Sequence, residues 1–146
     1  MNNDSDKERD GKDSSDFTLV LIFGVVALCI GALWLRFSHY DLVRANGGST
    51  GFIVSSVIAF VAFGLAVGLI IPLLRLEGVK KVRASRNMGF NMVMSGVAFI
   101  YMAANFFNSD SSMVVLGYLL AIPGLIIFWV NRKDNDPLGL RKHIKK

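Results

Sequence analysis

Four long stretches of this 146-residue sequence lack any aspartate, glutamate, lysine, arginine or histidine. They cover residues 17–35, 52–74, 88–107 and 113–130. The hydrocarbon core of a bilayer is about 30 Å thick, and one helix needs about 20 apolar residues to cross it. Because each stretch has about that length, the missing charges predict four transmembrane helices.

The same absence removes most routes to chemistry inside a membrane. Ionisable side chains within membrane spans mark proton relays and ion pathways, and none lies in these stretches. The chain has one cysteine, Cys29, and two histidines, which form no metal-ligand motif and no pair of nucleophile and base. We therefore expect neither an enzyme nor a bound metal or cofactor, and we interpret the methionines as adaptable packing residues.

Little polar sequence remains outside the four stretches. Residues 1–16 are rich in Asp, Ser and Lys and contain no aromatic residue, a composition typical of disordered segments. We expect a disordered acidic tail over 1–16, a transmembrane bundle over 17–131 and a basic tail over 132–146. The predicted fold class is all-α, an integral membrane four-helix up-and-down bundle.

The 16 lysines and arginines are unevenly distributed between the connections. Only Arg36 and Arg44 lie between the first and second stretches, and none lies in 108–112; the others lie before the first stretch, within 75–86, or after residue 131. Cytoplasmic segments carry the excess of Lys and Arg. This predicts that both termini are cytoplasmic. We expect an integral multi-pass protein of the plasma membrane. The short connection 108–112 predicts a tight antiparallel hairpin.

Small residues recur at helical spacing in the second, third and fourth stretches. They form a GxxxG motif, a seven-residue repeat and a pair four residues apart, and small residues let helix backbones approach closely in lipid. The candidate helix-contact residues are Gly64, Gly68, Gly89, Gly96, Ala103, Gly117 and Ala121. Two interpretations remain open: contacts within the bundle, or a face for another chain or a second copy.

The third stretch and the residue before it carry polar side chains at helical spacing, namely Asn87, Asn91, Ser95 and Asn105. With Ala98 and Met102 between Ser95 and Asn105, successive positions are three or four residues apart, which places them on one stripe of a helix. Asparagines that faced lipid would have unsatisfied polar groups, so the stripe is expected to face the bundle or a partner. It either joins helices by hydrogen bonds or lines a path through a homo-oligomer.

Two basic clusters lie on the predicted cytoplasmic side. They contain Lys80, Lys81, Arg83 and Arg86, and Arg141 and Lys142. Each such residue near an anionic leaflet contributes about 1 kcal/mol, so we expect contact with anionic lipid headgroups or with an acidic partner. We do not expect nucleic acid to bind, because cytoplasmic placement of basic residues accounts for the net charge of +5.

Taken together, these features favour a non-catalytic accessory or scaffold subunit of a larger membrane complex, which would bind other membrane subunits or itself. The alternative is a small transporter or channel that acts as a homo-oligomer, with the polar stripe along its path.

Overall fold

The computed structural model describes the backbone of residues 3–132 and the side chains of residues 17–132. All regular secondary structure in this part of the chain is helical, in agreement with the predicted class. The helices are α1 (Asn3–Ser38), α2 (Tyr40–Asn46), α3 (Thr50–Gly68), α4 (Ile70–Arg75), α5 (Gly78–Phe106) and α6 (Ser111–Val130).

Four segments are long and apolar enough to cross a membrane. They are Phe17–Ser38 in α1, Thr50–Arg75 across α3 and α4, Gly78–Phe106 in α5, and Ser111–Val130 in α6. Their number and order match the four uncharged stretches of the sequence. The helix lengths and composition are those of a small multi-pass membrane protein.

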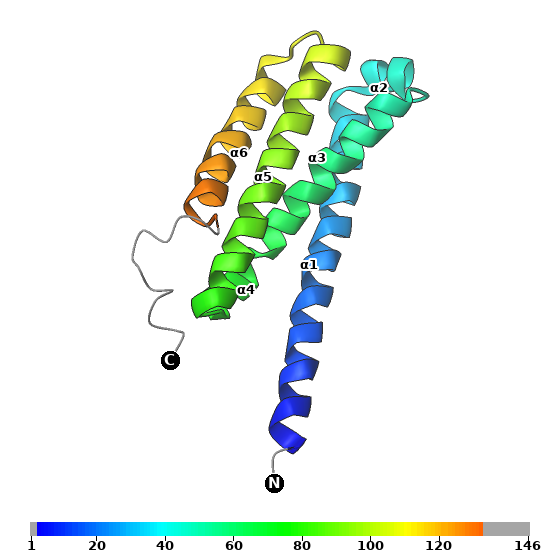
Figure 1. Ribbon diagram of the computed structural model, residues 1–146. Helices are drawn as coiled ribbons and strands as arrows, with labels where there is room; N and C mark the ends of the chain where they lie inside the picture. Colours follow the sequence, from blue (N-terminus) through cyan, green and yellow to red (C-terminus); the bar gives the residue numbers. More distant parts are fainter. Residues whose placement is uncertain (1–2, 133–146) are drawn as a thin grey trace.

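The four long segments lie in a row (Figure 1). Helix α1 packs against α3, α3 against α5, and α5 against α6, with successive segments antiparallel. Among the described residues, the end helices α1 and α6 form no interface of comparable extent with each other. The chain therefore has two inner segments, α3–α4 and α5, and two outer helices with one major neighbour each.

Helix α5 begins at Gly78, well before the predicted start of the third span at residue 88. Only Leu76 and Glu77 separate it from α4. Residues 79–86 contain lysine, arginine and alanine, which favour helix, and no proline. The basic segment that the sequence suggested was a loop is therefore mostly the first turns of a helix. In the same way, α2 occupies part of the predicted first loop.

Helix α1 also begins earlier than the predicted span, at Asn3 rather than Phe17. The segment predicted to be a disordered tail contains one glycine, Gly11, and no proline, so it has no strong helix breaker. A helix that forms in the apolar stretch can therefore extend toward the amino terminus. The division of the chain into tails and bundle stays a prediction.

The second span is broken between α3 and α4. Helix α3 ends at Gly68 and α4 begins at Ile70. Pro72 has no backbone N–H, and its ring clashes with the carbonyl group four residues earlier, which belongs to Gly68. The break therefore falls where the proline disrupts the helix.

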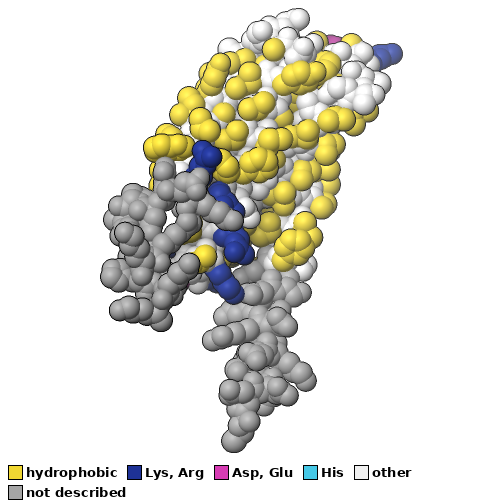
Figure 2. Space-filling view, viewed as in Figure 1, with side chains coloured by type: hydrophobic (Ala, Val, Ile, Leu, Met, Phe, Trp, Pro, Cys, Tyr) yellow, Lys and Arg dark blue, Asp and Glu magenta, His cyan; other side chains and the backbone are white. Residues whose placement is uncertain are grey.

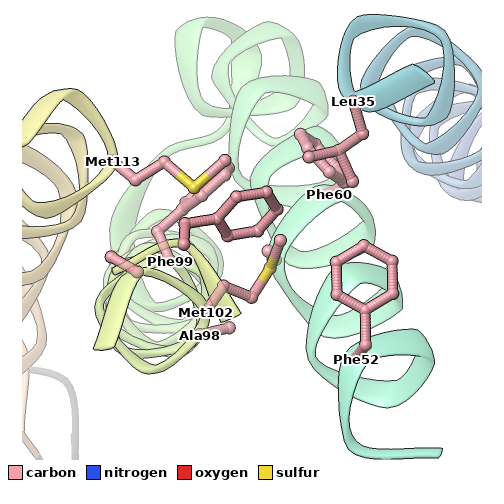
Figure 3. Packing of buried hydrophobic residues seen from close by; sticks show 10 residues of the cluster. Leu35, Phe52, Phe60, Ala98, Phe99, Met102 and Met113 are labelled. Carbon is pink, nitrogen blue, oxygen red and sulfur yellow. The ribbon is translucent and has the colours of Figure 1, made fainter. Parts of the chain in front are cut away.

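The large buried side chains gather in the half of the molecule near the α5–α6 turn. Figure 3 shows Phe60 of α3 and Phe99 of α5 packed together, with their ring centroids 5.3 Å apart and nearly perpendicular. Met102 and Met113 are fully buried beside them. At the opposite end, which carries the basic residues within 80–86 and is called the basic end, the buried residues are small, such as Ala66, Gly68 and Ala84. The end of the molecule near the α5–α6 turn is therefore packed with large side chains, and the basic end with small residues.

Candidate functional site

The GxxxG motif of α3 contacts α1. A Cβ atom placed on Gly64 would lie 2.6 Å from the Cβ of Ala27 and 2.8 Å from the Cα of Gly24. A Cβ on Gly68 would lie 3.1 Å from the Cα of Val20. Both glycines are buried, so this motif is occupied by a neighbouring helix of the same chain.

Glycines from both helices form the α5–α6 interface. A Cβ on Gly96 of α5 would lie 2.5 Å from the carbonyl oxygen of Gly117 and 2.6 Å from the backbone nitrogen of Ala121. About two helical turns closer to the amino end of α5, a Cβ on Gly89 would lie 2.8 Å from the carbonyl oxygen of Gly124. The two backbones touch here, so four predicted contact residues face one another within the chain.

Gly124 was not among the predicted contact residues. It is buried, and a Cβ on it would lie 2.7 Å from the Cβ of Met92. The sequence does contain its signal, because Gly117 and Gly124 are seven residues apart, like Gly89 and Gly96 on α5. The last predicted contact residue, Ala103, is fully buried in the core cluster.

Within the polar stripe, Ser95 joins two helices. Its side chain is fully buried, and its hydroxyl group donates a hydrogen bond of 2.7 Å to the carbonyl oxygen of Ala59 on α3. This is the arrangement in which a polar side chain stabilises a contact between helices.

Two of the three asparagines of the stripe donate local hydrogen bonds from their side chains. The amide of Asn91 donates to the carbonyl oxygen of Asn87, and that of Asn105 donates to the carbonyl oxygen of Tyr101. Asn105 is exposed, whereas the buried Ser95 and Met102 lie between it and the other two asparagines. The stripe therefore does not form one continuous polar surface.

An apolar groove lies between the two outer helices. It has a volume of about 360 Å³, and its walls include Val26 and Ile30 of α1 and Leu116 of α6, while Phe60 and Phe99 form part of its floor. We call it the α1–α6 groove. Most of its lining residues belong to α1 and α3, with one from α5 and one from α6.

A second groove lies at the basic end, between α1 and α5, with α3 and α4 behind it. Its larger hollow has a volume of about 380 Å³ and is lined mostly by apolar residues, such as Leu21 of α1, together with Asn87 and Asn91 of α5. An adjoining hollow of about 300 Å³ includes Lys80 and Arg83. Both hollows are lined by Leu69, Pro72 and Asn87, so we describe them together as the basic groove.

The opposite end carries a polar contact between connections. Asp110 caps α6 by accepting hydrogen bonds from the backbone N–H and the hydroxyl group of Ser112. Its carboxylate lies 4.0 Å from Nε2 of His39, whose ring also contacts Trp34 and Phe107. The Ser112 hydrogen bonds, with a further contribution from His39, hold the pKa of Asp110 below its ordinary value.

The basic residues of α5 separate into two groups. Lys80 and Arg83 line the basic groove, and Lys81 and Arg86 are not among its lining residues. Arg141 and Lys142 lie outside the described residues.

The described side chains contain no group of three or more His, Cys, Asp or Glu residues that could hold a metal ion. Comparison with protein-family models, with curated proteins and with solved structures finds no match. The class that fold and composition define is a small multi-pass membrane protein, and its function must be argued from the geometry.

Proposed function

We propose that this chain is a non-catalytic accessory or scaffold subunit that binds a helix of another membrane protein in the α1–α6 groove. The supporting observation is the unequal burial of its helices. In the most apolar part of α1 and of α6, 17% of residues are buried, against 39% in α3–α4 and in α5. The outer helices thus retain large apolar faces, and the groove lies between them.

The small-residue motifs do not supply this face, because Gly64 and Gly96 already contact neighbouring helices within the chain. The groove does have suitable dimensions. Its α1 wall runs from Phe23 to Trp34, which is about 16 Å, or three turns, at 1.5 Å per residue. Van der Waals packing along such a surface is the main source of helix association in lipid.

A matched pair of variants tests this proposal. Val26 lines the groove and Val25 does not, yet both are exposed residues of α1. We expect Val26→Trp to displace the partner and Val25→Trp to leave it bound, because only the first side chain fills the groove. The measurement is the mass of the complex extracted from its native membrane in mild detergent, with identification of all components by mass spectrometry.

A wild-type protein that runs as a lone monomer with no stoichiometric partner would contradict the proposal. Equal loss of the partner in the two variants would also contradict it, because the contact would then involve the α1 surface in general.

The proposed orientation places both termini and the α4–α5 connection in the cytoplasm. The distribution of Lys and Arg supports it. Single cysteines introduced at Ser109 and at Lys81, in a Cys29→Ser background, are expected to react with an impermeant maleimide from opposite sides of the membrane. Labelling of both from one side would exclude this threading.

The second candidate function is a homo-oligomeric transporter with Asn91 at its path. The observation in its favour is that Asn87 and Asn91 line an open groove. Reconstituted protein should then carry a cation or small solute across vesicles, and Asn91→Leu should abolish the flux. Absence of flux with every solute tested would leave the subunit role as the better explanation.

A further inference from the structure

The basic groove changes in chemistry along its length. Its outer part contains the cations Lys80 and Arg83, its middle contains the amides Asn87 and Asn91, and its inner part is apolar. Figure 2 shows basic side chains running along this end of the molecule, next to apolar surface. A ligand that matched the groove would be anionic at one end, polar in the middle and apolar at the other.

The length of α5 places these zones at definite depths in a membrane. Its 29 residues extend about 43 Å at 1.5 Å per residue, whereas the hydrocarbon core is about 30 Å thick. If Phe106 lies at the far boundary of the core, the near boundary falls close to Asn87. Arg83 then lies at headgroup depth, and Phe90 and Asn91 lie just inside the core.

We propose that the basic groove is a binding site for one anionic phospholipid from the leaflet that faces the α4–α5 connection. The phosphate lies at Arg83 and Lys80, the ester region contacts Asn87 and Asn91, and an acyl chain lies between α1 and α5. Basic pockets between transmembrane helices have the chemistry that anionic headgroups require. The proposal does not depend on the subunit role, because it involves a different surface.

The two parts of the groove together favour a lipid over other occupants. A free phosphate would use only the cationic end and leave the apolar part unfilled. An apolar helix of a partner would fill the inner part but would place no anion at Arg83. In a phospholipid, the anionic group and the hydrocarbon belong to one molecule, as the cations and the apolar lining belong to one groove.

The first arm of the test measures the headgroup contact. Purified protein in maltoside detergent is titrated with phosphatidylglycerol, and retained lipid is counted by native mass spectrometry. We expect one tightly held lipid, about tenfold weaker binding in Arg83→Gln, and little change in Lys81→Gln, because only the first substitution removes a charge-assisted hydrogen bond to the phosphate. Lys81 is the matched control, since it belongs to the same turn but is not part of the groove wall.

The second arm measures the acyl contact. Leu21 lines the groove and Ile22 does not, and both are exposed. We expect Leu21→Trp to release the lipid and Ile22→Trp to retain it, while inorganic phosphate at millimolar concentration displaces nothing. Equal effects of Arg83→Gln and Lys81→Gln would overturn the site. Loss in Arg83→Gln without loss in Leu21→Trp would overturn the acyl placement, and displacement by phosphate would show a simple anion site.

Discussion

The antiparallel helix pairs α5–α6 and α1–α3 are held together by different kinds of contact. In α5–α6, glycines of both helices face each other, so that backbone meets backbone on both sides of the contact. In α1–α3, the glycines of α3 meet the α1 backbone at one end, but at the other end the ring of Phe60 occupies the space beside Gly31. Backbone atoms of the partner helix lie close to every one of these glycines in α5–α6, whereas the α1–α3 contact depends at one end on a large side chain.

This difference predicts that the two helix interfaces tolerate substitutions unequally. A side chain at an interface can rotate or shift when its surroundings change, whereas two touching backbones can only separate. The loops agree with this contrast, because only a short turn joins α5 to α6, while α2 is inserted between α1 and α3. The α5–α6 hairpin is therefore expected to be the more rigid and the less adjustable pair.

The largest expected effect comes from adding a methyl group at the backbone contact. We expect Gly96→Ala to destabilise the protein by about 3 kcal/mol, the upper part of the range for overpacking, because the new Cβ would lie 2.5 Å from the carbonyl oxygen of Gly117. The free energy of unfolding can be measured by denaturant titration in micelles, with Trp129 of α6 as the fluorescent reporter.

Gly24→Ala is the control in the other pair. Its Cβ would meet side chains and no backbone, at 3.2 Å from Cδ2 of Leu65 and 3.9 Å from Cγ1 of Val61, and the Leu65 side chain can move. We expect a change below about 1 kcal/mol. If the two substitutions destabilise equally, the contrast between backbone and side-chain contacts is wrong.

Much of this architecture could be predicted from the sequence, because absence of charge over the length of a membrane span depends on composition alone. The positions of the glycines also follow from spacing. Their partners could not be predicted, since Gly64 could equally have faced α1, α5 or another chain. The arrangement of the helices in a row could not be predicted either, because it depends on which helix faces pack against one another.

The candidate sites were harder to predict for a similar reason. Spacing placed Ser95 and the asparagines on one stripe, but a stripe does not show which member reaches another helix. Only Ser95 does so, through the carbonyl oxygen of Ala59. The basic groove was missed because its walls come from α1, α3, α4 and α5, and because α5 extends helically into what was predicted to be a loop.

The next expected effect concerns the turn that closes the α5–α6 pair. We expect Asp110→Ala to destabilise the protein by about 1 kcal/mol, the typical effect of removing a helix N-cap, because the backbone N–H of Ser112 loses its acceptor. Asp110→Asn retains an acceptor at that position and should recover most of the loss. Equal losses in the two variants would show that the charge, rather than the cap, stabilises the turn.

The same residue predicts a pH dependence. The pKa of Asp110 is lowered from its ordinary value of 3.8, so the folded state favours the ionised carboxylate. This contribution to stability is therefore complete above the unfolded-state pKa and is lost as the pH falls through the lowered one. Wild type should lose stability relative to Asp110→Asn only below about pH 4; a difference already lost at neutral pH would contradict this assignment.

The smallest effect is expected where the two pairs meet. The hydroxyl group of Ser95 bonds across α3 and α5, whereas that of Ser56 bonds within α3 to the carbonyl oxygen of Phe52. Hydrogen bonds between membrane helices contribute about 0.6 kcal/mol on average. We expect Ser95→Ala to lower the free energy of unfolding by that amount and Ser56→Ala to change it less. A loss in Ser95→Ala as large as that in Gly96→Ala would mean that the α3–α5 contact, rather than the α5–α6 hairpin, holds the row together.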